Sequence, residues 1–363
     1  MITIREADIN DNEELLALTG VTPMSGAISL RIDRGPDFFR LMELRGEGVV
    51  FVALADHRII GCLSVTYQHV NIDGKPQRVA YVADFKVHPS LSGSRAALKM
   101  VQACIDHIMK QGVDLVFNIV AGGNERVISM LTHGKFGFPK FESFGRFLVH
   151  EILGSPLRES ANRYEIQEGN ENDIPGICRI CNDFNRSYQL GPLKTEDDFR
   201  SFRGAAANEP ALRILTARRD GEIMATLCSF DAGHLKQNVV TAMPKSLRLL
   251  VSALRFSSKI LPFYTFPKVG EAIRLLYLRN VAFKEGHRRA LRVLLQRVRH
   301  EVFRERYSFV TIGLHEHDPL RFLVRGLPRY TFVAEGYVAS LHKDRSLLAK
   351  IAAGIPMEDF ALV

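Results

Sequence analysis

Apolar positions along the chain follow a strand and helix pattern that begins twice. In the first copy, alternating or continuous apolar runs predict strands at residues 2–5, 49–54, 59–67, 78–87, 114–120 and 141–152. Apolar residues at helical spacing predict helices at 10–19, from 34 to about 44, from 96 to Gly112, and at 124–133. Strands and helices therefore alternate through the first 152 residues.

The same order starts again after a polar stretch at 154–163. Strands are predicted at 164–166, 212–217, 222–230, 273–281 and 309–314, with helices at 173–182 and after Gly286. We predict an α/β fold of two tandem domains, each a mixed, mostly antiparallel sheet with helices on both faces. The predicted boundaries are 1–153, a linker at 154–163, 164–345, and a C-terminal tail at 346–363.

One short turn is present in both copies. Ser92-Gly93-Ser94-Arg95-Ala96-Ala97-Leu98-Lys99 recurs as Glu285-Gly286-His287-Arg288-Arg289-Ala290-Leu291-Arg292, and matched residues are 193 positions apart. Each turn leads from a strand into a helix. Free backbone amides and the positive end of the helix dipole favour an anion there. The repeat predicts a duplicated nucleotide- or coenzyme-binding unit.

The copies differ by an insertion at about 236–270 in the second domain. This segment mixes Lys and Arg with Leu and Phe. One interpretation is an amphipathic segment, at 243–269, that contacts a membrane surface or lines an apolar acceptor site. The alternative, which we favour, is a helical insertion that packs on its own domain or across the domain boundary.

Composition narrows the functional classes. The 363 residues are 46% hydrophobic and 24% charged, typical of a globular protein, and the formal net charge is +8. No apolar run is long enough to span a bilayer and the start lacks the order of a signal peptide, so we expect a cytoplasmic protein. The positive charge suits a phosphorylated ligand, and without a reader motif we do not expect nucleic-acid binding.

Two clusters of metal-ligand residues are interpreted as structural. Cys178 and Cys181 form a CxxC pair, but no second pair completes a zinc site, and their helical spacing in an apolar stretch favours core thiols. The segment 315–318 reads His-Glu-His-Asp. On a strand end alternate side chains point in opposite directions, so at most two would converge. We therefore expect no metal.

The strand and turn at 81–97 resemble the central motif of the GNAT N-acetyltransferase family. In that family a strand ending in Val-x-Pro, here Val87-His88-Pro89, precedes a glycine-containing turn and a helix. Asn124 and the later Gly137-Phe138 also resemble that family's pattern. The resemblance covers most of residues 1–152 and, more weakly, 164–342.

The resemblance implies a site for acetyl-CoA or another acyl-CoA, and no metal. Its pantetheine arm would pair with the strand before the turn, and its pyrophosphate would bind the turn. The implied residues in the first domain are Phe85, Lys86, Val87, Ser92, Gly93, Ser94, Arg95, Ala96, Ala97 and Asn124. Those in the second domain are Leu278, Asn280, Gly286, His287, Arg288, Arg289 and Ala290.

Departures from the motif distinguish the two domains. Ser92 and Glu285 stand where the family has Arg or Gln, and Arg95 and Arg288 replace its first glycine. The carboxylate of Glu285 would repel a pyrophosphate. The first domain is therefore predicted to be catalytic and the second to be a degenerate copy that shapes the acceptor cleft.

Acyl transfer to an amine needs a base for the amine and an acid for the thiolate. Asp84, on the strand beside the expected thioester, is the candidate base, and a hydrogen-bonded structural carboxylate is the alternative. His133 is the candidate acid, and a solvated histidine at a helix end is the alternative. The segment 34–39 either shapes the acceptor site or simply begins a helix.

Three functional hypotheses follow from the sequence. The first is an acyl-CoA-dependent N-acyltransferase whose acceptor is a small-molecule or peptide amine. The second is an aminoacyl or long-chain acyl transferase, favoured by the basic and apolar insertion. The third is a non-catalytic, CoA-responsive regulatory module, favoured by the incomplete motif.

Overall fold

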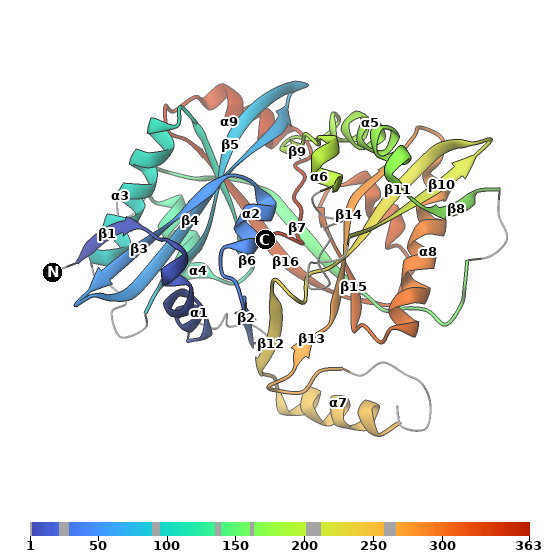
Figure 1. Cartoon of the computed structure of the whole chain (residues 1–363), viewed down its shortest axis with the longest axis horizontal. Coiled ribbons are helices and arrows are strands. Elements are labelled where there is room, and N and C mark those ends of the chain that lie inside the picture. Colours follow the sequence, from blue (N-terminus) through green and yellow to red (C-terminus); the bar gives the residue numbers. More distant parts are fainter. Residues whose placement is uncertain are drawn as a thin grey trace.

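Strands from both halves of the chain join one mixed sheet. The computed structural model describes residues 2–21, 29–88, 95–134, 139–159, 163–200, 212–257 and 266–363. Within these residues thirteen strands form the sheet, with order β1-β3-β4-β5-β6-β16-β7-β15-β14-β11-β10-β8, and β9 pairs with β4 at the side (Figure 1). All pairs are antiparallel except β5 with β6 and β14 with β15. The predicted α/β class with a mixed, mostly antiparallel sheet is confirmed.

The predicted elements occur in the predicted order, and the structure adds strands and helices that were not predicted, at residues 29–33, 191–192, 196–200, 329–340 and 345–353. The first half contains β1 (Thr3–Glu6), α1 (Asn12–Gly20), β2 (Ser29–Asp33), α2 (Arg40–Arg45), β3 (Gly48–Ala55), β4 (Arg58–Ile72), β5 (Lys75–Val87), α3 (Arg95–Lys110), β6 (Leu115–Ala121), α4 (Glu125–Thr132) and β7 (Glu142–Ile152). The second contains β8 (Glu165–Glu168), α5 (Ile174–Asn185), β9 (Gly191–Pro192), α6 (Glu196–Arg200), β10 (Leu212–Arg219), β11 (Glu222–Asp231), β12 (Gln237–Ala242), α7 (Lys245–Ser257), β13 (Ala272–Ile273), β14 (Leu275–Phe283), α8 (Arg288–Arg304), β15 (Phe309–His315), β16 (Arg329–Ser340) and α9 (Arg345–Ala353).

Helices cover both faces of each half, as predicted. In the second half, the apolar stripe of α8 packs on the face to which Leu276, Leu278 and Ile312 point. On the opposite face Leu275 and Tyr277 pack with α5. The stripe of α3 covers the first half in the same way, with Met100, Cys104 and Ile108 buried against β4 and β6.

The last strands of the two halves are exchanged. β7 pairs with β15 of the second half, and β16 returns to pair with β6 of the first half. β7 and β16 also pair with each other at the centre of the sheet. Each half is therefore completed by a strand of the other, which the sequence pattern did not reveal. The division of the chain at 154–163 remains a prediction.

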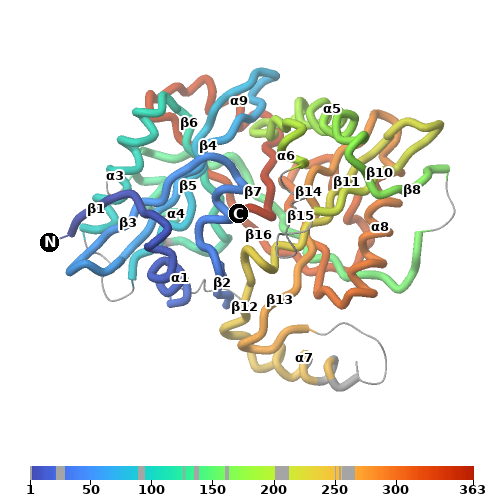
Figure 2. The backbone as a smooth tube through the Cα atoms, viewed as in Figure 1, coloured from blue at the N-terminus to red at the C-terminus, as the bar shows by residue number. Residues whose placement is uncertain are grey.

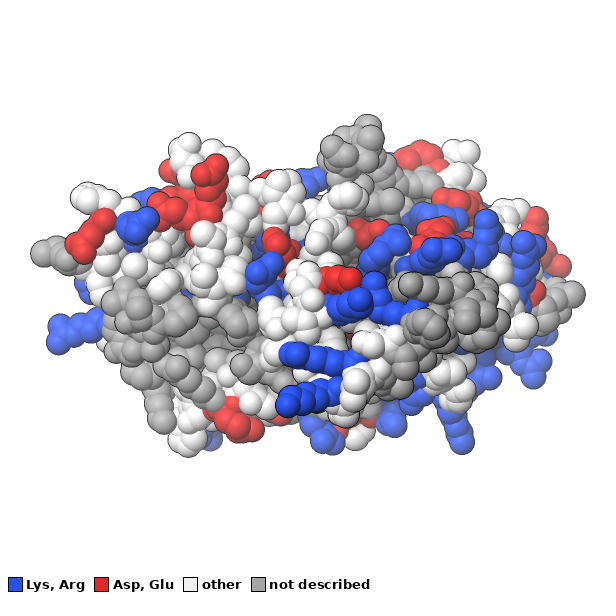
Figure 3. Space-filling view, turned by 90° about the horizontal axis from the view of Figure 1, so that it is seen from below, with Lys and Arg blue, Asp and Glu red and all other residues white. Residues whose placement is uncertain are grey.

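The insertion connects the halves on one side of the sheet. β12 pairs with β13 and with β2, so three strands from both halves form a second small sheet. α7 extends beyond it, at the bottom of Figure 1. The insertion thus packs across the boundary between the halves, which is the interpretation that we favoured from the sequence. Seen from that side, Lys and Arg gather over the second half (Figure 3). Membrane contact through 243–269 remains a prediction, and no helix among the described residues is long and apolar enough to span a bilayer.

Candidate active site

A gap opens between β5 and β6 in the first half. The two parallel strands pair at Ala80 with Val116 and at Tyr81 with Phe117, and β5 then continues to Val87 without a further partner on β6 in the described residues. Residues 82–88 are partly exposed. The predicted coenzyme residues Phe85, Lys86 and Val87 thus lie on a strand edge that an extended ligand can pair with.

The strand bends where the gap begins. Asp84 has φ +53°, and the register between β4 and β5 shifts between Cys62 and Ser64. The bulge turns the last residues of β5 away from β6. The second half repeats this feature at Asn280, with φ +48° and a shift between Thr226 and Cys228.

The bulges correct the predicted alignment of the two halves. Matching Asp84 to Asn280 places the counterparts of Phe85 and Val87 at Val281 and Phe283, three residues later than the spacing of the turns implies. Leu278, assigned to the second coenzyme site from the sequence, points into the core beneath α8. Asn280 is the bulge itself, and its Nδ2 donates to Cys228 Sγ at 3.7 Å.

The first glycine turn follows this strand along the chain. Ser92, Gly93 and Ser94 fall outside the described residues, as do Pro89, Gly137 and Phe138. α3 begins at the exposed Arg95, while Ala96 is buried and Ala97 is half-buried. The start of this sixteen-residue helix, where the helix dipole is positive, is thus the next described element after β5. Asn124 is occupied locally, because its side chain accepts from Val127 N at 3.5 Å and caps α4.

The second glycine turn has free space around its glycine, and two of its side chains contact aromatic residues of the fold. Gly286 has φ +79°, and a Cβ added there would meet nothing within 4 Å beyond its chain neighbours. His287 Nδ1 lies 3.3 Å from the Tyr164 hydroxyl, and the Arg288 guanidinium lies 4.2 Å from the centre of the Phe322 ring. Arg289 is exposed and Ala290 is buried.

Asp84 is held in an ion pair. Its Oδ2 accepts from Arg34 Nη1 at 2.8 Å and from Ser64 Oγ at 3.0 Å. The Asp84 and Arg34 side chains are 12% and 8% exposed. Arg34 follows β2 directly, so the segment 34–39 contributes a residue to this site rather than only a helix start. The role of Asp84 as base remains a prediction.

His133 ends helix α4 on the surface. Its Nδ1 lies 2.9 Å from the carbonyl oxygen of Ser129, one turn earlier in the same helix. This contact satisfies the helix end, where carbonyl groups lack helical partners. A role for His133 as proton donor remains a prediction.

Two ionisable groups that the sequence analysis missed lie where the halves meet. Burial raises the pKa of Glu151, on β7, to about 7, and its Oε2 accepts from the Thr311 hydroxyl at 2.6 Å. Burial, together with the charge of Arg34, lowers the pKa of Lys236 to about 7. Pairs of groups with displaced pKa values gather at catalytic sites. Neither residue belongs to a motif. The only signal in the sequence is that Glu151 stands among apolar neighbours.

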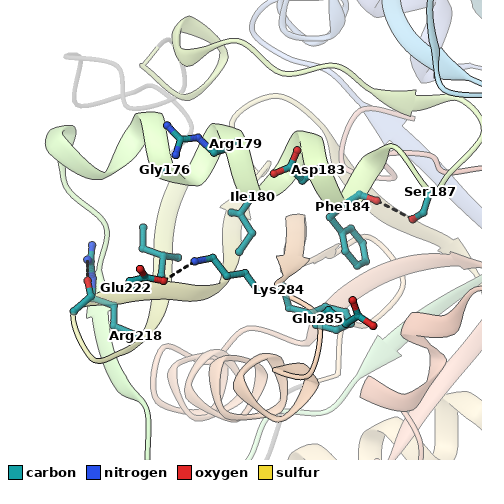
Figure 4. Close-up of a pocket in the computed structure, with 13 residues that line it drawn as sticks. Gly176, Arg179, Ile180, Asp183, Phe184, Ser187, Arg218, Glu222, Lys284 and Glu285 are labelled. Atoms are coloured by element: carbon teal, nitrogen blue, oxygen red, sulfur yellow. Dashed lines mark hydrogen bonds and ion pairs between the residues drawn. The ribbon is translucent and has the colours of Figure 1, made fainter.

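A cavity of about 860 Å³ lies in the second half, between α5, the β10–β11 hairpin and the end of β14 (Figure 4). Ile180 and Phe184 point into it from α5 (Figure 4). Phe283 also lines it, and the centre of its ring lies 5.2 Å from that of Phe184. Lys284 Nζ crosses its lower side to Glu222 at 2.9 Å. In the first half, Glu14 of α1 accepts from Ile59 N at 2.8 Å, beside the turn between β3 and β4.

The described residues contain no group of three His, Cys, Asp or Glu side chains arranged for a metal. Cys178 Sγ donates to Lys194 O, and Cys181 Sγ to Asn280 O. In the 315–318 segment, Glu316 pairs with Arg146 at 2.8 Å and Asp318 accepts from Tyr188 at 2.9 Å. Each of these side chains therefore makes a hydrogen bond or an ion pair within the protein.

Residues 24–138, which contain the gap and the first turn, match the Acetyltransferase (GNAT) family. The first half is a GNAT domain. This confirms the resemblance found in the sequence, and with it the prediction of an acyltransferase-class enzyme. No curated protein sequence matches the chain.

Solved structures share the fold over nearly the whole chain. The GCN5-related N-acetyltransferase from Anabaena variabilis is 12% identical, with a TM-score of 0.53 over 93% of this chain and 72% of that one. Saccharomyces cerevisiae N-myristoyltransferase with bound myristoyl-CoA is 11% identical, with a TM-score of 0.64 over 93% of this chain and 82% of that one. At these identities the likeness shows the fold, and it supports two GNAT-like halves in this chain.

Proposed function

We propose that the chain is an acyl-CoA-dependent N-acyltransferase whose first half binds the coenzyme. The gap beyond Tyr81 and Phe117, in the half that matches the GNAT family, carries this proposal. The pantetheine arm pairs with the edge at Phe85, Lys86 and Val87. The turn from Ser92 to Ala97 and the start of α3 bind the pyrophosphate.

The reaction needs a neutral amine beside the thioester. The nitrogen lone pair of the acceptor attacks the thioester carbonyl, the C–N bond forms, and the C–S bond breaks to release CoA as a thiolate. A base takes the amine proton and an acid protonates the thiolate. We assign these steps to Asp84 and His133, and we place the acceptor, a small-molecule or peptide amine, between the halves.

Acetyl-CoA is the proposed donor. The cavity between α3 and the separated ends of β5 and β6, beside Val82 and Asn118, is only about 20 Å³, little more than room for one water. An acyl group bound in this cavity would have to be short. The alternative is a long-chain donor, which the likeness to N-myristoyltransferase with bound myristoyl-CoA favours.

Calorimetric titration of matched glycine variants tests the assignment. We expect Gly93→Trp to weaken acetyl-CoA binding at least tenfold, because a large side chain obstructs close approach of the pyrophosphate to the turn. Gly286→Trp alters the equivalent position of the second half and should leave the affinity unchanged.

An unaltered isotherm for Gly93→Trp would contradict the proposal. Titration with myristoyl-CoA distinguishes the two donors, since tighter binding of the long chain would favour the alternative. Release of CoA in the presence of a panel of amines distinguishes an enzyme from the regulatory module that the sequence left open.

A further inference from the structure

The residues after α9 run into the middle of the molecule. The chain leaves α9 at Ala353, passes Gln189, whose carbonyl accepts from Met357 N at 2.9 Å, and ends between the two halves (Figure 2). Phe360, Ala361 and Leu362 are at most 9% exposed. We call residues 357–363 the inner segment. It is built into the core, unlike the C-terminal tail expected from the sequence.

Both halves bind the inner segment through buried ion pairs. From the first half, Arg45 Nη2 donates to both carboxylate oxygens of Glu358 at 2.9 Å, and both side chains are 4% exposed. From the second half, Arg279 Nε donates to Asp359 Oδ2 at 2.7 Å. Lys236 Nζ donates to the carbonyl oxygens of Phe360 and Val363 at 3.2 and 2.6 Å. Such buried pairs fix the position of a segment, because breaking one would leave a buried charge without a partner.

The inner segment covers the gap of the second half. β14 and β15 pair in parallel as far as Tyr277 with Thr311, and then separate as β5 and β6 do. Arg279 and Gly313 lie two residues beyond that last pair, one on each strand. Asp359 is bound to Arg279, and the Phe360 ring lies on Gly313 so closely that a Cβ there would be 2.0 Å from Cδ2. The segment therefore crosses both separated strands.

The first gap lacks these anchors. The counterparts of Arg279 and Gly313 are Ala83 and Ile119, each two residues beyond the last pair of β5 and β6. Alanine offers no cation for Asp359, and isoleucine leaves no flat surface for the ring. The two gaps therefore differ in the residues that retain the segment, although their strand geometry is alike.

We propose that Asp359 and Phe360 act as a built-in occupant of the second gap and keep the pantetheine arm of acyl-CoA out of it. The chain then has one coenzyme site, although it has two gaps and two glycine turns. This inference rests on the proposed function, because it takes the first gap as the place of the arm.

Gly313→Ala tests the inference in the full-length protein. The added methyl group forces the Phe360 ring from its seat, and amide hydrogen exchange at 357–362 should rise accordingly. Calorimetry with acetyl-CoA should then give two sites per chain instead of one. In Gly313→Ala/Phe360→Ala the ring no longer clashes and Asp359 keeps its bond to Arg279, so protection of the segment and a single site should return.

Gly336→Ala is the matched control. Gly336 lies on β16 of the same sheet, and the ring that a Cβ there would meet, at 2.1 Å, is that of Phe144 rather than Phe360. This variant is overpacked to a similar degree but should keep one site and a protected segment. If Gly313→Ala fails to fold, Asp359→Asn/Phe360→Ser releases the segment without added volume.

The outcomes separate the inference from the proposed function. A released segment with still one site, a segment that stays protected in Gly313→Ala, or two sites in the wild type would each overturn the inference alone. No binding by any of the proteins would overturn both. No binding by the wild type with one site in Gly313→Ala would support the inference and overturn the assignment of the first half.

Discussion

Glu151 and Lys236 place two ionisable side chains with near-neutral pKa values in the interior. Glu151 lies on the strand that the first half lends to the second, and its carboxylate accepts from the hydroxyl of Thr311. Lys236 binds carbonyl oxygens, and its amine lies 4.9 Å from the centre of the Tyr277 ring. Both groups lose hydration on folding, so each favours its neutral form.

Stability should therefore depend on pH through these residues. Because burial raises the pKa of Glu151 to about 7 in the folded state, the folded protein binds one more proton than the unfolded chain between about pH 4.5 and 7. Unfolding free energy then falls as pH rises through that window, by at most about 1.4 kcal/mol per pH unit. Denaturant titrations of Glu151→Gln should show this slope removed.

Lys236 should have the opposite effect in a higher window. Burial lowers its pKa to about 7, so between about pH 7 and 10.5 the unfolded chain binds the extra proton and stability rises with pH.

Glu222→Gln is a control for Glu151, because the hydrogen bond from Lys284 lowers the pKa of Glu222 and moves its titration below the window. An unchanged slope in Glu151→Gln would contradict the burial argument.

Among the elements, the first helices of the two halves are each preceded by a capping box. Asp8 and Asp11 form a capping box before α1, and Asn170 and Asp173 form one before α5. In each box the two side chains accept from one another's backbone amides, which satisfies donors that lack helical partners. The repeated cap supports the duplication independently of the glycine turns.

Removal of one cap should weaken the molecule measurably. Asn170 Oδ1 accepts from Asn172 N at 2.9 Å. We expect Asn170→Ala to lower the unfolding free energy by about 1 kcal/mol in urea titrations. Asn170→Asp keeps the acceptor and should retain most of the stability. Equal stability of Asn170→Ala and the wild type would show that the cap contributes nothing.

For the whole molecule, strand exchange makes the two halves interdependent. Without β16, strands β6 and β7 of the first half lose the strand between them, and without β7, β15 loses a neighbour. The exposed edges would carry unpaired backbone groups over apolar surfaces. The inner segment adds a second connection, bound from both sides.

Separate halves should therefore fail to fold alone. We expect residues 1–159 and 163–363, expressed separately, to be aggregated or to lack a cooperative thermal transition, and to regain one when refolded together. The intact chain should unfold in a single calorimetric transition. A stable, cooperatively folding fragment of residues 1–159 would show that the exchange is dispensable.

The predicted elements show which parts of the fold can be predicted from the local pattern of apolar residues. The strands at 59–67 and 78–87 and the helix after Gly286 were predicted close to their observed positions, because alternating or helical apolar spacing reports the buried face directly. The GNAT resemblance was predictable for the same reason, since the strand and turn are contiguous in the chain. The strand at 29–33 was missed because its partner, β12, is more than 200 residues away.

The sequence by itself determined the α/β class, the duplication and the family of the first half, because each depends on residues close together along the chain. Only the tertiary structure decided which strand completes which half, where the bulges realign the copies, and which gap the inner segment covers. The Arg34 pair with Asp84, the near-neutral Glu151 and Lys236, and the inner segment all join residues distant in sequence. Their energies depend on burial and on distances in space, which no local pattern encodes.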